Sequence, residues 1–81
     1  MKLPRDVSGA DLVRRLARLG YVEVRQSGSH RRLTAATPRG QHHVTVPLHD
    51  ELRIGTLSAI LTEVEQAHDL TRDELLERLF N

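Results

Sequence analysis

Three short segments in which apolar and polar residues alternate constrain the fold of this chain more than any other feature. The segments are YVEVRQ (21–26), HRRLTA (30–35) and HHVTVP (42–47). Alternation with a period of two is typical of a strand with one buried face. SGS separates the first pair of segments, and the loop ATPRGQ (36–41) separates the second. These short connections favour an antiparallel meander of three strands.

The stretch before the strands, SGADLVRRLARL (8–19), predicts a helix. Ser8 can cap its N-terminus, and Asp11 follows three residues later, as in a capping box. Gly20 is a natural residue just past the C-terminus of a helix. The arginines of this stretch lie opposite an apolar stripe with helical spacing. The stripe comprises Leu12, Val13, Leu16 and Leu19.

Two further helices are predicted after the strands. Thr56 is the expected cap of the first, whose apolar stripe begins at Leu57. The second, TRDELLERLF (71–80), begins with a capping box formed by Thr71 and Glu74. Helices gathered on one face of an antiparallel sheet form an α+β sandwich. We expect the 81 residues to form a single domain.

Charge is distributed unevenly along the chain. Residues 1–49 carry nine Lys/Arg and three Asp/Glu, whereas residues 50–81 carry three Arg and eight Asp/Glu. A basic half indicates a working surface for a polyanion such as nucleic acid. The absence of cysteine excludes disulfides and a cysteine nucleophile. No apolar run approaches a membrane span or a signal peptide, so we expect a cytoplasmic protein without a membrane partner.

Strand alternation predicts which side chains occupy the open face of the sheet. The residues expected to face the helices are Val22, Val24, Arg31, Leu33, Ala35, His42, Val44 and Val46. The residues expected on the open face are Glu23, Arg25, His30, Arg32, Thr34, His43 and Thr45. Gly28 and Ser29 form the turn that leads to His30. The open face therefore gathers cations and imidazoles, which suit a phosphodiester substrate.

The motifs GSHRRL, HHVTVPLH and LRIGTLSAIL together resemble the HicA family of toxin mRNA interferases, which belong to HicA–HicB toxin–antitoxin pairs. The resemblance covers about residues 2–65. It implies a double-stranded-RNA-binding-domain-like α-β-β-β-α fold, in agreement with the order of elements above. It also implies an endoribonuclease that cuts mRNA and a HicB-type antitoxin as partner. The last helix, about 71–80, lies beyond the resemblance and could cap the core, form a dimer or contact the antitoxin.

The resemblance maps the catalytic histidine of the family onto His30. RNA can be cleaved without a metal or another cofactor, because its 2′-OH is a built-in nucleophile. Histidine, with a pKa of about 6.5, suits the proton transfers, and Arg25 and Arg32 are predicted to bind the phosphate. The further candidate substrate contacts are Ser29, His43 and His49. The second proton-transfer group is left open among His43, His49 and bulk water.

The same residues bear on other sites and functions. We expect no metal site, because His42 and His43 are neighbours on a strand and point to opposite faces. The alternative function is a non-catalytic RNA-binding module that contacts the RNA backbone, since only Tyr21 and Phe80 could stack on bases. A third possibility is a protein-interaction subunit. A homo-oligomer and a heteromeric toxin–antitoxin complex both remain open.

Overall fold

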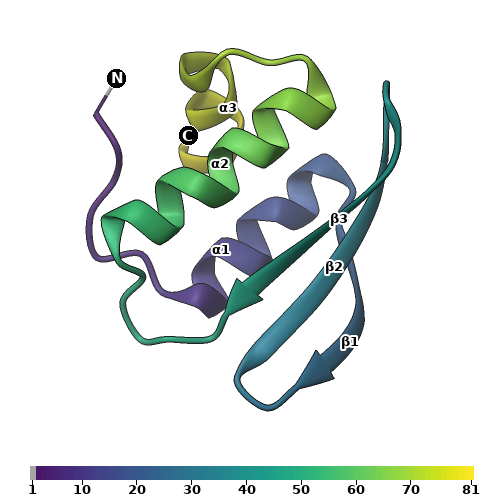
Figure 1. The fold of residues 1–81 in the computed structure, drawn as a ribbon. Coiled ribbons are helices and arrows are strands. Elements are labelled where there is room, and N and C mark those ends of the chain that lie inside the picture. Colours follow the sequence, from purple (N-terminus) through teal and green to yellow (C-terminus); the bar gives the residue numbers. More distant parts are fainter. Residues whose placement is uncertain (1) are drawn as a thin grey trace.

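The computed structural model describes residues 2–81 as one helix, a three-stranded sheet and two further helices (Figure 1). The sheet is antiparallel with strand order β1-β2-β3. The elements are α1 (Gly9–Leu16), the 3-10 helix η1 (Ala17–Leu19), β1 (Val22–Ser27), β2 (His30–Thr37), β3 (Gly40–Pro47), α2 (Ile54–His68) and α3 (Arg72–Phe80). The predicted α+β architecture is confirmed, and it is consistent with a double-stranded-RNA-binding-domain-like fold.

Two tight turns define the meander. Gly28 and Ser29 connect β1 to β2. Gly28 has a φ of 59° whereas Ser29 has no positive φ, which is the pattern of a type II′ turn. A turn at residues 38–39 connects β2 to β3. The expected loop at 36–41 is therefore shorter than predicted, because its outer residues extend both strands.

The first helix begins and ends largely as its sequence predicts. The hydroxyl oxygen of Ser8 accepts a hydrogen bond from the backbone N–H of Asp11 at 2.9 Å, which confirms the predicted cap. The Asp11 carboxylate does not complete a capping box but pairs with Arg14 and Arg15. Gly20 follows η1 in the left-handed conformation, with a φ of 89°.

The two C-terminal helices begin differently. The Thr71 hydroxyl accepts from the backbone N–H of Glu74, and the Glu74 carboxylate accepts from that of Thr71. The predicted capping box is therefore confirmed. α2 instead has Arg53 at its N-cap and no side-chain cap bond. The prediction that Thr56 caps this helix is wrong, because the helix begins two residues earlier at Ile54.

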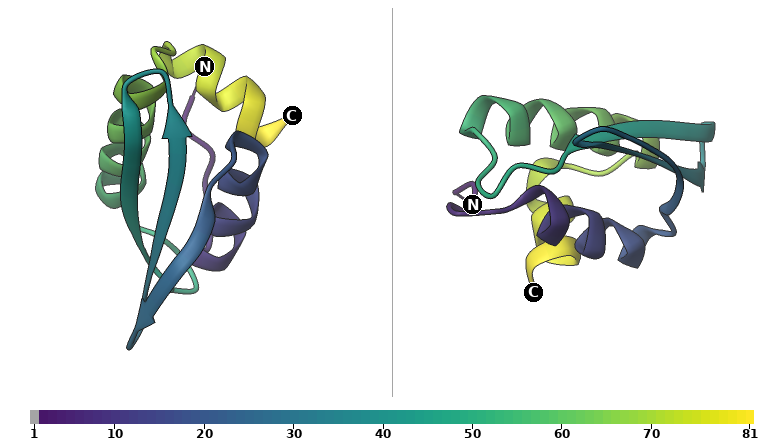
Figure 2. Two further views of the ribbon diagram at one scale, coloured as in Figure 1. Left: turned by 90° about the vertical axis from the view of Figure 1, so that its right-hand side faces the viewer. Right: turned by 90° about the horizontal axis from the view of Figure 1, so that it is seen from below.

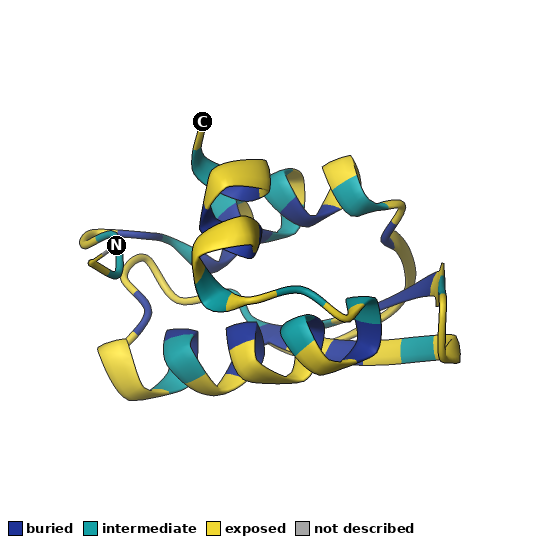
Figure 3. Ribbon diagram, turned by 90° about the horizontal axis from the view of Figure 1, so that it is seen from above, coloured by how far each residue is buried: buried dark blue, intermediate teal, exposed yellow. Residues whose placement is uncertain are grey.

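The core lies between the sheet and the helices. Leucine and valine side chains from both layers pack together there. The buried residues of the helices lie on their inner sides (Figure 3). The predicted inward residues of β2 and β3 other than Arg31 and His42 are buried. The core residues are Val7, Leu12, Leu16, Tyr21, Leu33, Ala35, Val44, Val46, Leu52, Leu57, Ile60, Leu61, Val64, Leu75, Leu76 and Leu79.

The C-terminal helix completes this core and is docked on α1 (Figure 2). The Arg15 guanidinium donates to the backbone carbonyl of Leu79 at 2.8 Å and lies 4.5 Å from the centre of the Phe80 ring. Arg18 donates to the same carbonyl at 3.0 Å. Helix C-termini leave carbonyl groups without intrahelical partners. Arginines of α1 and η1 therefore donate hydrogen bonds to a free carbonyl group at the end of α3. Sequence periodicity does not predict this contact.

Within residues 2–81, none of the helices combines the length and the apolar character needed to cross a membrane.

Candidate active site

The register of the strands shows which residues share the open face of the sheet. Residues directly opposite each other in an antiparallel sheet lie on the same face. Leu33 of β2 is opposite Val44 of β3, and both are buried. Even-numbered residues of β2 therefore face away from the core. Thr34, expected on the open face, is nevertheless buried, and the Gln41 side-chain amide donates to its hydroxyl at 2.8 Å. The left view of Figure 2 looks toward this open face.

Three rows of residues cross the open face. The row at the β1–β2 turn is Ser27, His30 and Pro47. The next row is Arg25, Arg32 and Thr45, and the third is Val22, Thr34 and His43. The five basic or hydroxyl residues predicted to gather here do so in these rows. They are Arg25, His30, Arg32, His43 and Thr45.

A bulge in β1 explains two wrong predictions and one correct one. The register shifts between Glu23 and Arg25, and Val24 has no residue opposite it. Val22 and Val24 were expected to face the helices but are 59% and 51% exposed. Glu23, expected outside, is opposite Leu33 on the inner face. Because a bulge inserts one residue, Arg25 nevertheless returns to the open face.

His30 lies at one end of the sheet, as the first residue of β2 after the tight turn. It is exposed, and its register partners are Ser27 and Pro47. Just past the end of β3, the backbone N–H of Leu48 donates to the carbonyl of Ser29 at 2.6 Å. The pairing of the two chains therefore continues one residue beyond the strand, close to the candidate catalytic position.

The segment after β3 is held against the start of α1. The backbone N–H of Gly9 donates to the carbonyl of His49 at 2.9 Å. A Cβ on Gly9 would lie 1.9 Å from the carbonyl oxygen of Pro47, so only glycine fits this contact. The backbone of His49 is thereby fixed at the end of the sheet that carries His30, and the residue itself is exposed.

Within residues 2–81, the arginines of the open face have no carboxylate partner. In the described part of the chain, residues 2–81, neither Arg25 nor Arg32 takes part in an ion pair. Arg32 donates to the Thr45 hydroxyl at 3.4 Å. Arg31, on the inner face as predicted, pairs with Glu23 at 2.5 Å. The two outward guanidinium groups are therefore available to an anion, whereas the inward one is engaged.

One tyrosine and two histidines form a cluster on the inner side of the sheet that the sequence does not predict. The Tyr21 hydroxyl lies 2.7 Å from Nδ1 of His42 and 3.1 Å from Nε2 of His68. Burial, with a contribution from Glu63, raises the pKa of Tyr21 to about 12. Burial, followed by electrostatic interactions with His42 and Arg78, lowers the pKa of His68. The inward, half-buried position predicted for His42 is confirmed.

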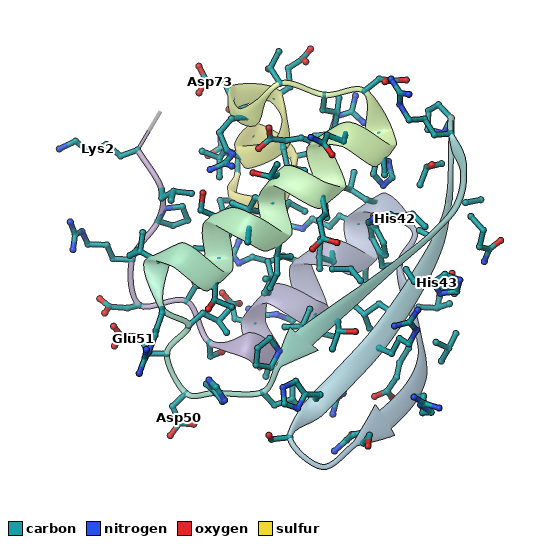
Figure 4. All side chains as sticks on the ribbon, in the orientation of Figure 1. Lys2, His42, His43, Asp50, Glu51 and Asp73 are labelled. Atoms are coloured by element: carbon teal, nitrogen blue, oxygen red, sulfur yellow. The ribbon has the colours of Figure 1, made fainter. Side chains whose placement is uncertain are left out.

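Potential metal ligands are dispersed. His42 and His43 lie on opposite sides of β3, as Figure 4 shows. Among residues 2–81, the histidines and carboxylates form no group of three or more that could hold a metal ion.

A pocket lies at the other end of the sheet from His30. It has a volume of about 870 Å³ and lies between the β2–β3 turn and the end of α2. Its lining includes Thr37, Arg39, Gln66 and Leu70 but not His30 or the arginines of the open face. The candidate active site is therefore a surface of the sheet and not this cavity.

Comparisons with known proteins point to one family. A family model described as the HicA toxin of bacterial toxin-antitoxin matches residues 9–67. The match runs from α1 almost to the end of α2 and leaves α3 outside. Neither the curated proteins nor the solved structures give a significant match to the chain.

Proposed function

The chain belongs to the HicA toxin family of bacterial toxin–antitoxin systems, and on this premise we propose that it is a metal-independent endoribonuclease that cleaves mRNA. Members of this family are generally mRNA interferases, and a toxin of such a system is paired with an antitoxin. His30 is the catalytic residue in this proposal and acts as general acid or base. A HicB-type antitoxin neutralises the activity.

One observation carries the proposal, namely the row of Arg25, Arg32 and Thr45 directly beside the row of His30. An RNA phosphodiester is cleaved when its 2′-oxygen attacks phosphorus and the 5′-oxygen leaves. Negative charge builds up on the phosphoryl oxygens, and guanidinium groups match those oxygens in geometry and charge. Neither arginine has a carboxylate partner within residues 2–81, so both can meet the phosphate.

The remaining surface suits contacts to the RNA backbone. The further substrate contacts in this proposal are Ser29, His43 and His49. Tyr21, one of two aromatic side chains of the Phe/Trp/Tyr type, is buried, and Phe80 packs against the core. Neither can serve as an open stacking platform for bases, so phosphate and 2′-OH contacts dominate.

The proposal is tested by the chemistry of the RNA ends. The purified protein is incubated with an RNA oligonucleotide in excess EDTA, and the fragments are analysed by mass spectrometry. We expect a 2′,3′-cyclic phosphate on one fragment and a 5′-hydroxyl on the other. Fragments that carry only 3′-hydroxyl ends, or cleavage that EDTA abolishes, would contradict the mechanism. RNA that is bound but never cut would favour the binding-module alternative.

A second experiment tests the place of the protein in a toxin–antitoxin pair. Induced expression of the wild-type chain should arrest growth, and co-expression of the small protein encoded beside it should restore growth. Copurification of the two proteins would identify the antitoxin. Growth that continues under strong induction, with the folded protein present, would argue against the toxin activity.

A further inference from the structure

We propose that His49 is the second proton-transfer group of this site and acts with His30 on one phosphodiester. The inference rests on the proposed endoribonuclease function and deepens it. Cleavage needs one group that takes the proton of the 2′-OH and one that supplies a proton to the leaving 5′-oxygen. The sequence leaves His43, His49 and water open for the second role, and the structure separates them.

His43 lies too far along the sheet. It belongs to the row of Thr34, four residues along β2 from the row of His30. At about 3.3 Å per residue, these rows are about 13 Å apart. The attacking and leaving oxygens are bonded to the same phosphorus atom, so both proton-transfer groups must come within hydrogen-bond reach of one phosphate. His43 is therefore suited to a neighbouring part of the RNA.

His49 lies at the correct end of the sheet. His30 is opposite Pro47, and the bond from Leu48 N–H to the Ser29 carbonyl continues the pairing past that point. His49 is two residues beyond Pro47, past the end of β3, and its carbonyl accepts from Gly9. Two residues of extended chain span at most about 7 Å, so His49 stays close to the row of His30. Two imidazoles at this end of the sheet can flank one phosphate.

The imidazoles of His30 and His49 are also free to meet a substrate, whereas those of the two partly buried histidines are not. His42 and His68 both contact the Tyr21 hydroxyl. In the described part of the chain, the rings of His30 and His49 form no hydrogen bond or ion pair, and both residues are exposed. The backbone of His49 is fixed through its carbonyl, which accepts from Gly9. A fixed backbone with a free ring suits a group that must meet a substrate.

The chemical step balances with these two groups. The 2′-oxygen forms a bond to phosphorus while the bond between phosphorus and the 5′-oxygen breaks. One imidazole takes the proton of the 2′-OH, and the other, which enters as imidazolium, gives its proton to the 5′-oxygen. The products are a 2′,3′-cyclic phosphate and a 5′-hydroxyl. Proton exchange with water then returns both histidines to their starting states.

The test uses a leaving group that needs no proton. Two substrates are compared: an RNA oligonucleotide that the wild-type protein cuts at one bond, and the same oligonucleotide with sulfur in place of the 5′-oxygen at that bond. On the normal RNA, His30→Gln and His49→Gln should each lower kcat by about 10²–10⁴-fold. On the sulfur substrate, the variant that lacks the acid should recover most of the wild-type rate, and the variant that lacks the base should not.

His43→Gln is the matched control on the same face. It should raise KM and show the wild-type ratio of rates on the two substrates. Circular dichroism and thermal unfolding should match the wild type for all three variants, because the replaced rings are exposed. The inference is overturned if His49→Gln retains the wild-type kcat on normal RNA, or if the sulfur substrate rescues both variants or neither. A wild-type protein that cuts no RNA overturns the proposed function itself.

Discussion

Neighbouring arginines of β2 serve different purposes at the scale of single residues. Arg31 faces the inner side and pairs with Glu23, whereas Arg32 faces the open side and contacts Thr45. The alternation of strand side chains separates the two environments. A run of two arginines therefore supplies one group that ties β1 to β2 and one group that is available to a substrate.

Arg32→Ala should weaken catalysis without weakening the fold. In the proposed site, this change removes a charge-assisted hydrogen bond to phosphate, worth about 1.5–3 kcal/mol, so kcat/KM should fall about 10–100-fold. The melting temperature should stay close to that of the wild type, because the Arg32 side chain is exposed. Steady-state kinetics and calorimetry measure the two effects.

Arg39→Ala is the matched control for this prediction. Arg39 is an exposed arginine of the β2–β3 turn that pairs with Asp69, away from His30. An exposed pair of this kind contributes little to stability. Equal activity of the Arg32 and Arg39 variants would show that Arg32 does not bind the substrate phosphate.

The Tyr21 cluster couples stability to pH through His68. The pKa of His68 is lowered in the folded state, which therefore disfavours the protonated imidazole. In the unfolded chain the histidine keeps a pKa near 6.5. The unfolded state then binds more protons in the window below pH 6.5. The contribution of His68 to stability is therefore fully present above pH 6.5 and is lost as the pH falls through that window.

His68→Gln should flatten this pH dependence. Urea midpoints of the wild type should decline between pH 7.5 and pH 5, and those of the variant should decline less steeply. The other groups near the hydroxyl and the imidazole are His42, Glu63 and Arg78, and they are unchanged in the variant. Parallel curves for the two proteins would show that His68 does not contribute the expected proton linkage.

At the scale of elements, the faces occupied by side chains could be predicted for the two regular strands but not for the strand with a bulge. β2 and β3 pair without interruption from His30–Pro47 to Thr37–Gly40, so parity assigned their faces correctly. β1 alternates equally well in sequence, yet its bulge moves Val22 outward and Glu23 inward. A bulge is set by pairing with the neighbouring strand, and single-residue alternation carries no sign of it.

Contacts between distant segments were the other part that sequence could not supply. Tyr21 precedes β1, His42 lies in β3 and His68 ends α2, so the three side chains meet only in the folded chain. The docking of Arg15 on the end of α3 joins residues 64 positions apart. Helix caps are local signals. The cap at Ser8 and the capping box at Thr71 were predicted correctly, whereas the cap at Thr56 was not. The role of His30 is still a prediction that rests on the resemblance to the family.

The two threonines near helix starts give a direct test of capping. Thr71→Ala removes the hydroxyl that accepts from Glu74 and should cost about 1 kcal/mol in the free energy of unfolding. Thr56→Ala should change it by less than about 0.5 kcal/mol, because Thr56 lies inside the first turn of α2 and caps nothing. Urea denaturation measures both. Equal losses would contradict the assigned helix start.

At the scale of the whole molecule, α3 adds to the core that the family match covers. Residues 9–67 match the family model, yet three leucines of α3 are at most 3% exposed. Of the roles that the sequence left open for this helix, the structure supports capping of the core. The buried leucines are Leu75, Leu76 and Leu79.

Deletion of residues 70–81 should abolish cooperative folding. Burial of each leucine contributes about 1.5–3 kcal/mol, so three together approach the total stability of about 5–15 kcal/mol that is typical of a domain. The truncated chain should show a broad thermal transition and bind hydrophobic dyes. A sharp transition near the wild-type melting temperature would show that α3 is dispensable for the core.

The central claim is that His30 performs chemistry on an RNA that the surrounding face binds. The most direct measurement compares His30→Gln with the wild type on one RNA oligonucleotide, with binding measured by fluorescence anisotropy and cleavage measured under single-turnover conditions. We predict an RNA affinity within about 3-fold of the wild type and a cleavage rate at least about 10²-fold lower. Cleavage by the variant at the wild-type rate would contradict the claim.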